Sequence, residues 1–214
     1  MSENLLTYQA AQDYLASLVP QREKELLEME AYAESHGFPI IGPACGYYCY
    51  QLARMMKAKS IFELGSGYGY STAWFAKAVK ENGGGVVHHT VWDEELSQMA
   101  RNSLIKLGCA DVVSFHVAEA VETLRKTEGL FDIIFNDIDK QAYPESLPII
   151  KEKLISGGLL IIDNMLWSGR IFDATDSTPT TKGVLEFTRQ ITTDKDWIVS
   201  LSPMRDGMIV AYKK

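Results

Sequence analysis

The residues of this sequence that are best suited to chemistry begin with a glycine-rich segment. Residues 63–71 read ELGSGYGYS and continue the apolar run that starts at Ile61. Glycines permit a tight turn and close approach of a ligand to the backbone, and a following helix offers free N–H groups. The spacing is G-x-G-x-G, not the G-x-G-x-x-G of dinucleotide enzymes. Because Glu63 can accept hydrogen bonds from an amine, the segment favours a ligand with an ammonium group and a carboxylate. The alternative is a glycine turn with a purely structural role.

Acidic side chains follow two further apolar runs. The residues concerned are Asp137, Asp139 and Lys140 after the first run, and Asp163 and Asn164 after the second. The carboxyl ends of adjacent parallel strands lie side by side, so Asp137, Asp163 and Asn164 are expected to converge. Two carboxylates and an amide oxygen are hard ligands of the kind that Mg²⁺ or Ca²⁺ prefers, and Mn²⁺ is a further candidate. The sequence therefore predicts a divalent-cation site. The alternative is that these acids only cap strand ends or helix N-termini.

A parallel sheet must position these groups. From Ser60 onwards short apolar runs alternate with amphipathic stretches, which is typical of a parallel sheet covered by helices on both faces. The expected strands are 61–64, 86–91, 112–115, 131–135 and 159–162, with helices at 70–81, 94–107, 119–126 and 144–154. A last helix at 181–192 precedes two runs, 197–201 and 208–212, whose short connection predicts an antiparallel pair. Three helices are expected before the sheet, at 8–18, 23–34 and 45–57.

These elements predict a single α/β domain over residues 1–214. Its core, residues 59–214, is expected to be a doubly wound, mostly parallel seven-stranded sheet that ends in an antiparallel hairpin. Residues 1–58 are expected to form a helical cap on that core. No internal repeat and no low-complexity linker divides the chain.

Composition and charge exclude several classes of protein. The 214 residues are 46% hydrophobic and 23% charged, as in a globular protein with one large core. No apolar run approaches the ~20 residues of a membrane-spanning helix. The net charge of −7 gives no generic attraction to nucleic acids or anionic membranes. Residues 1–4 are polar, without the features of a signal peptide, and the three cysteines show no metal spacing. We therefore expect a cytoplasmic protein with reduced thiols.

Four motifs resemble one enzyme family. In chain order they are ELGSGYGYS at 63–71, DIDKQAY at 137–143, GG at 157–158 followed by DNMLWSG at 163–169, and DG at 206–207. Together they resemble the cation-dependent S-adenosylmethionine O-methyltransferases, which include caffeoyl-CoA and catechol O-methyltransferases and small bacterial relatives. The resemblance covers roughly residues 38–214. It implies a Rossmann-like methyltransferase fold, a homodimer, and methyl transfer from S-adenosylmethionine to a small catechol-like or vicinal-diol phenol.

The resemblance also implies a role for each matching residue. Lys140 would be the general base, and Asp137, Asp163 and Asn164 would bind the divalent cation, with Asp137 also part of the catalytic centre. The residues that would contact the cofactor are Ile41, Glu63, Gly65, Ser66, Gly67, Tyr68, Ser71, Glu119, Ala120, Asp137 and Asp139.

The sequence departs from the family pattern in the adenine-contacting loop, where residues 117–119 lack the usual glycine, and above all at the end of the second core strand. The family ends its second core strand with an acid that binds the ribose hydroxyls, whereas this sequence has Val91, which cannot accept a hydrogen bond. Either Asp93 turns inward from two positions later, or the ribose contact is absent. A non-catalytic protein that keeps the fold is therefore an alternative. Two others are methylation of a hydroxylated tRNA nucleoside, which the acidic charge disfavours, and a nicotinamide oxidoreductase, which the glycine spacing argues against.

Overall fold

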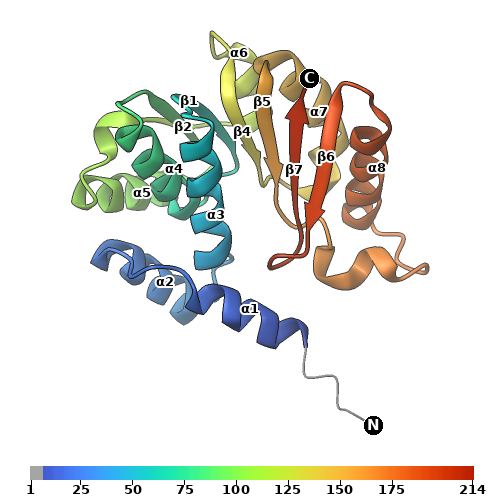
Figure 1. The fold of residues 1–214 in the computed structure, drawn as a ribbon, viewed down its shortest axis with the longest axis horizontal. Coiled ribbons are helices and arrows are strands. Elements are labelled where there is room, and N and C mark those ends of the chain that lie inside the picture. The colour runs from blue at the N-terminus through green and yellow to red at the C-terminus, as the bar shows by residue number, and fades with distance from the viewer. Residues whose placement is uncertain (1–6) are drawn as a thin grey trace.

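The computed structural model describes residues 7–214, and its centre is a seven-stranded sheet with helices on both faces (Figure 1). The strands are β1 (Ser60–Leu64), β2 (Val86–Val91), β3 (Val113–Val117), β4 (Phe131–Asn136), β5 (Leu154–Ile162), β6 (Trp197–Ser202) and β7 (Met208–Lys213). The helices are α1 (Tyr8–Ser17), α2 (Lys24–His36), α3 (Gly42–Met55), α4 (Tyr70–Glu81), α5 (Glu94–Lys106), α6 (Ala120–Lys126), α7 (Tyr143–Lys153) and α8 (Pro179–Thr193). Residues 1–4, from which we expect no signal peptide, lie outside the described part. Within that part, every helix is too short or too polar to cross a membrane.

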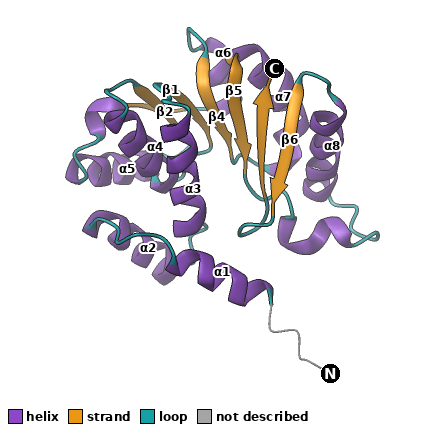
Figure 2. Cartoon of the chain, in the orientation of Figure 1, coloured by secondary structure: helices purple, strands orange, loops and turns teal. Residues whose placement is uncertain are grey.

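The strand order is β3-β2-β1-β4-β5-β7-β6. Figure 2 shows the strands in orange and the helices that flank them in purple. Strands β1 to β5 pair in parallel, and β7 is antiparallel to both of its neighbours, β5 and β6. This confirms the predicted doubly wound sheet with a C-terminal antiparallel hairpin. The order reverses between β1 and β4, and in such sheets the crevice at the carboxyl ends of the strands beside the reversal is the usual binding place.

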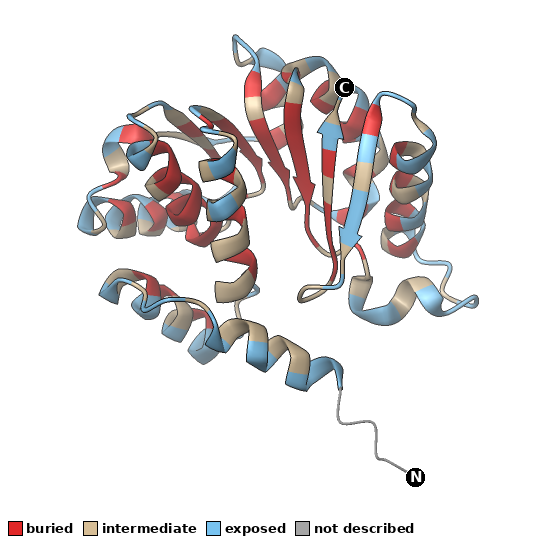
Figure 3. Ribbon diagram, viewed as in Figure 1, coloured by how far each residue is buried: buried red, intermediate tan, exposed pale blue. Residues whose placement is uncertain are grey.

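Alternating side chains build a separate core on each face of the sheet. Ile61 packs with α3, α4 and α5 on one face, whereas the next residue, Phe62, packs with α6, α7 and α8 on the other. Ile133 and Ile134 of β4 divide between the two faces in the same way. The central strands are consequently buried along their length (Figure 3). Burial on both faces explains why these strands appear in the sequence as continuous apolar runs.

The fifth strand is longer than predicted, because it begins at Leu154 and not at Leu159. Gly157 and Gly158 interrupt the apolar pattern without ending the pairing with β4, whose register shifts at this point. A Cβ on Gly158 would lie 2.8 Å from Cγ of Leu154 and 3.0 Å from the carbonyl oxygen of Asp132. Glycine is therefore required for the close approach of the two strands. Most other predicted boundaries lie within three residues of the observed ones.

Helix α1 connects the cap to the C-terminal hairpin. It lies on the side of the sheet where β4 and β5 end (Figure 1). The Gln12 side chain accepts a hydrogen bond from the Arg205 N–H at 2.6 Å and donates one to the Pro203 carbonyl at 3.2 Å. Both partners belong to the β6–β7 turn, which we define as residues 203–207. Helix α1 thus fixes a turn whose residues lie 191 and 193 positions away from Gln12 in the sequence.

Candidate active site

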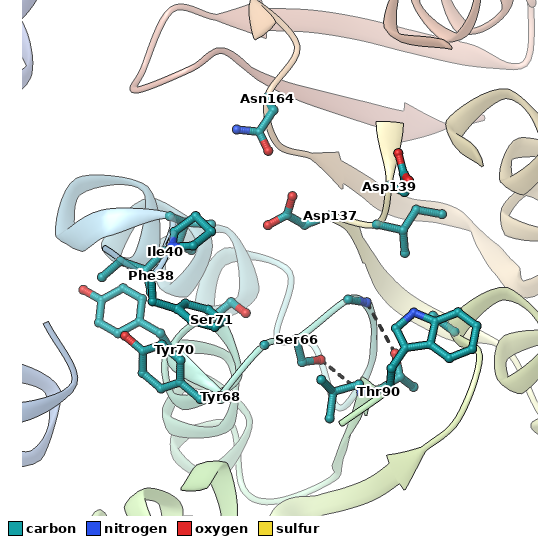
Figure 4. A pocket seen from close by; sticks show the side chains of 18 of the residues that line it. Phe38, Ile40, Ser66, Tyr68, Tyr70, Ser71, Thr90, Asp137, Asp139 and Asn164 are labelled. Carbon is teal, nitrogen blue, oxygen red and sulfur yellow. Dashed lines mark hydrogen bonds between the residues drawn. The ribbon is translucent and has the colours of Figure 1, made fainter. Parts of the chain in front are cut away.

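The glycine-rich segment forms one wall of a cavity of about 580 Å³ at the carboxyl ends of the parallel strands. Gly65 and Gly67 have φ values of +84° and +49°, in the left-handed region that favours glycine. A Cβ on Gly65 would lie 2.6 Å from the Asp137 carbonyl oxygen, so glycine alone lets the segment pack this closely on the end of β4. Ser66 ties the segment to β2: its N–H donates to the Thr90 carbonyl at 2.8 Å, and its hydroxyl accepts from the Thr90 N–H at 3.0 Å (Figure 4).

Glu63 lies at the end of β1 behind this cavity. Its side chain is fully buried, and within the described part of the chain neither carboxyl oxygen has a partner with hydrogen-bond geometry. Burial raises the pKa of Glu63 to about 7, and the nearby hydroxyls of Ser71, Thr72 and Ser66 lower it in part. Glu63 does not itself line the cavity, whereas Ser66 and Ser71 do. Because buried polar groups normally have partners, the Glu63 carboxyl is an unmatched group of this region.

Two of the three predicted oxygen ligands, Asp137 and Asn164, line the cavity, whereas Asp163 is buried and is not a lining residue. Asp137 follows β4, and Asp163 and Asn164 follow β5. Burial and then the neighbouring Asp137 raise the pKa of Asp163 to about 6, while Arg205 and Lys140 lower it. Asn164 has a left-handed backbone, with φ +58°, and its amide nitrogen donates to Asp206 at 3.0 Å. This leaves the Asn164 oxygen on the side of Asp137 (Figure 4).

A cationic side chain is paired with each of the two carboxylates. Lys140 Nζ donates to Asp137 Oδ1 at 2.6 Å, and Arg205 Nη1 donates to Asp163 Oδ2 at 2.7 Å. The Asp163 side chain is only 1% exposed, and its other oxygen, Oδ1, has no hydrogen-bond partner among residues 7–214. Asp163 thus has one oxygen that is paired with Arg205 and one buried oxygen for which the structure describes no partner.

Lys140 is held in a fixed position at the edge of the cavity. It is 8% exposed, and Nζ also donates to the Ile138 carbonyl at 3.1 Å. The ring centroids of Tyr143 and Trp167 lie 5.2 Å and 5.9 Å from Nζ. Helix α8 supports the backbone from behind, since a Cβ on Gly183 would lie 2.2 Å from the Lys140 carbonyl oxygen. The ammonium group is therefore positioned by hydrogen bonds, aromatic faces and close backbone packing.

Most of the predicted cofactor-contacting residues line the cavity. They are Ile41, Gly65, Ser66, Gly67, Tyr68, Ser71, Ala120, Asp137 and Asp139.

The structure does not bring Asp93 or Glu119 into the cavity. Asp93 accepts a hydrogen bond from the Leu96 N–H at 3.0 Å and caps α5, and Glu119 caps α6 by accepting from the N–H groups of Val121 and Glu122. Capping a helix N-terminus is a strong local preference of acidic side chains, and here it turns both carboxylates away. The residues that line the cavity in their place are Val91, Trp92 and Ala118.

A second cavity of about 830 Å³ adjoins the first. The two share Asn164, Trp167 and Arg205, and the second extends between Tyr8 of α1 and Phe172. Arg205 is the residue of this site that sequence reasoning misses. The available signal is its position directly before the Asp206-Gly207 motif, which places it at the same strand ends as the acidic cluster.

The relatives of this chain belong to one enzyme family. The family model described as O-methyltransferase matches residues 19–214. The chain belongs to the O-methyltransferase family. This O-methyltransferase is 27% identical over 186 residues to a catechol O-methyltransferase of Niastella koreensis, with 84% of this chain and 83% of the relative covered. It is 26% identical over 227 residues to a probable caffeoyl-CoA O-methyltransferase of Arabidopsis thaliana, with 99% and 94% covered.

Solved structures agree with the fold of this O-methyltransferase. The Bacillus cereus O-methyltransferase in complex with SAH matches with a TM-score of 0.86 and 24% identity, over 97% of this chain and 100% of that one. TomG of Streptomyces achromogenes, solved in complex with SAM, matches with a TM-score of 0.82 and 24% identity over 96% of each chain. The predicted family and the Rossmann-like methyltransferase fold are therefore confirmed.

Proposed function

We propose that this O-methyltransferase transfers the methyl group of S-adenosylmethionine to a hydroxyl of a small catechol-like or vicinal-diol phenol. The observation that carries the proposal is that the glycine-rich segment, Asp137, Asn164 and Lys140 border one cavity, with the buried Asp163 next to Asn164 in the chain. The names of the related catechol and caffeoyl-CoA O-methyltransferases support the class of acceptor. The SAM and SAH complexes of similar folds support the cofactor.

The cavity suits the proposed cofactor in size and chemistry. A volume of about 580 Å³ lies within the usual range for small-molecule sites. The N-terminal turn of α4 offers backbone N–H groups and the Ser71 hydroxyl to a carboxylate, while the unpartnered Glu63 carboxyl favours a nearby ammonium group. Ile41 and Ala120 supply apolar surface for the rest of the molecule. When bound, S-adenosylmethionine supplies an electrophilic methyl group on a sulfonium.

We further propose that Asp137, Asp163 and Asn164 hold a divalent cation, with Mg²⁺ as the first candidate and Mn²⁺ or Ca²⁺ as others. Their fit is supported by the unpartnered buried Oδ1 of Asp163 and by the hard oxygen chemistry of all three side chains. Such an ion, when bound, favours the anionic form of a phenol, whose pKa in water is about 10.

Lys140 is the proposed general base. In its neutral form Nζ accepts the proton of the acceptor hydroxyl, and Asp137 and the Ile138 carbonyl keep this atom in place. Tyr143, which is fully buried, and Trp167 cover the lysine and keep water away from the reacting groups.

A transfer assay with radiolabelled S-adenosylmethionine and a panel of polyphenols tests the proposal. We expect label in catechol-like phenols in the presence of Mg²⁺ and its loss when a chelator is added. Incorporation that ignores the chelator would contradict the cation site alone. No incorporation into any phenol would contradict the acceptor class.

A non-catalytic protein with the same fold is the second candidate, and Val91 is the observation that favours it. Val91 lines the cavity, and no carboxylate takes its place, because Asp93 caps α5. Calorimetry with S-adenosylmethionine, with and without Mg²⁺, separates the two functions. Absence of binding at millimolar cofactor would favour the non-catalytic protein.

We also propose that the chain forms a homodimer and acts in the cytoplasm. Tyr14 and Leu18 in and just after α1 are 64% and 59% exposed, which supports a partner for the cap. The three cysteines are free and buried, in keeping with a reducing compartment. Sedimentation velocity of the wild type and of Tyr14→Glu tests the dimer, and the variant is expected to sediment as a monomer.

A further inference from the structure

We propose that Arg205 is a built-in competitor of the divalent cation, and that the cation binds Asp163 only when the Arg205 guanidinium leaves that carboxylate. The inference rests on the cation site of the proposed function. It adds a residue, Arg205, that governs the affinity of this site for the divalent cation. Neither the resemblance to known enzymes nor the predicted ligand set contains this arginine.

The first support is the geometry of the ion pair. Arg205 Nη1 lies 2.7 Å from Asp163 Oδ2, and the Asp163 side chain is almost completely buried. A guanidinium at this distance holds one of the two oxygens that a metal ion would share. The other oxygen, Oδ1, has no partner in the part of the chain that the structure describes, so the ion pair satisfies only one of the two carboxylate oxygens. A divalent cation with open coordination positions would supply the partner that Oδ1 lacks.

The second support is the local charge. Asp137 and Asp163 carry two negative charges, which Lys140 and Arg205 balance at 2.6 Å and 2.7 Å. Each of the two carboxylates is therefore matched by one cation before any metal ion arrives, while Asp206, which accepts a hydrogen bond from Asn164, adds a further negative charge nearby. A divalent ion that entered beside both cations would be repelled by them, and this repulsion is poorly screened at a buried carboxylate. Removal of one cation is the direct way to accommodate the ion.

The third support is that Arg205 can leave and Lys140 cannot. The Arg205 side chain is 32% exposed and lines the second cavity as well as the first, so it has open space on its other side. Lys140 is enclosed by Asp137, the Ile138 carbonyl and two aromatic rings. The backbone of Arg205 stays fixed by Gln12, so the exchange requires only a change of side-chain rotamer. Arg205 is thus the movable member of the cluster.

Titration with Mn²⁺, followed by electron paramagnetic resonance of the free ion, tests the proposal without cofactor or acceptor. The variants are Arg205→Gln, which removes the charge, and Arg205→Lys, which keeps the charge without the planar fork. Arg54→Gln is the matched control, because Arg54 forms an ion pair of 2.6 Å with Glu81 and is 38% exposed. When only a fraction of the protein can bind a ligand, the apparent affinity equals the intrinsic affinity multiplied by that fraction. We expect Mn²⁺ to bind Arg205→Gln at least about tenfold more tightly than it binds the wild type. The affinity of Arg205→Lys for Mn²⁺ should lie between those two values, and the affinity of Arg54→Gln should equal that of the wild type.

Thermal unfolding provides a second readout. Without metal, Arg205→Gln leaves a buried carboxylate unpaired and lowers the melting temperature, and saturating Mn²⁺ is expected to raise it more than in the wild type. If Arg205→Gln does not fold, Arg205→Lys still decides the question, since unchanged or weaker Mn²⁺ binding in that variant overturns the proposal. Equal binding by wild type and Arg205→Gln also overturns it and leaves the cation site intact. Absence of Mn²⁺ binding in all variants overturns the cation site and this inference together.

Discussion

Replacing Glu63 by glutamine removes a carboxyl group that the fold buries without a partner. The substitution keeps the size and shape of the side chain at the end of β1. The amide that it introduces can donate to the hydroxyls of Ser66, Ser71 and Thr72, which surround the carboxyl in the wild type. The pH dependence of the free energy of unfolding is therefore expected to change without a change of fold.

The size of the effect follows from the pKa of Glu63. Burial raises this pKa to about 7 from an ordinary value of 4.5. The folded state therefore binds the proton more tightly than the unfolded chain. Its stabilising contribution is complete below pH 4.5 and is lost as the pH rises through 7. The whole loss corresponds to about 3 kcal/mol, of which about 2.5 kcal/mol falls between pH 5 and pH 8.

Denaturant unfolding of both proteins at pH 5 and pH 8, followed by tryptophan fluorescence, measures this difference. From pH 5 to pH 8 the Glu63→Gln variant should gain about 2.5 kcal/mol of stability relative to wild type. Burial lowers the pKa of His88 to about 4 and that of His89 to about 3, so both titrate in the opposite sense; they do so equally in the two proteins and cancel. Glu186→Gln on the exposed face of α8 is the control and should show no such gain. A relative gain below about 1 kcal/mol would refute the reasoning.

Further substitutions test the remaining parts of the site. Lys140→Met should abolish methyl transfer while calorimetry still detects S-adenosylmethionine; unchanged turnover would exclude Lys140 as the base. Gly65→Ala should lose cofactor binding and at least about 2 kcal/mol of stability in denaturant unfolding, because its φ is +84° and its Cβ meets a backbone oxygen at 2.6 Å. Asp93→Ala should cost about 1 kcal/mol in the same measurement through loss of the α5 cap and leave cofactor affinity unchanged. Val91→Asp should tighten cofactor binding in calorimetry, because it supplies the acid that would bind the ribose hydroxyls. Weaker binding would contradict a ribose contact at this position.

The fold is readable from the sequence because its strands are buried on both faces. Runs such as 61–64 and 131–135 are apolar at all positions but Glu63 and Asp132, whereas the helices between them need apolar residues only on one side. The convergence of Asp137 with Asp163 and Asn164 follows from the same logic, since parallel strands place their carboxyl ends side by side. These parts of the prediction depend on periodicity and chain order alone.

The parts that sequence reasoning misses depend on local competition or on distant contacts. Asp93 and Glu119 stand near the cavity in sequence, but the nearest free N–H groups belong to the helices that they precede. Arg205 reaches Asp163 because its turn adopts a left-handed φ of +44° and because Gln12 accepts its N–H from 193 residues away. Neither the helix capping by Asp93 and Glu119 nor the contact between Arg205 and Asp163 produces a periodic pattern in the sequence.

The hydrogen bonds between Gln12 and the β6–β7 turn join segments that are 191 and 193 residues apart in the chain. Arg205 of this turn lines both cavities, so the wall between them depends on a long-range contact, whereas the glycine-rich wall is held by the neighbouring strands β2 and β4. Substitutions in α1 can consequently alter the second cavity while the glycine-rich wall stays intact, so the two cavities are open to separate evolution.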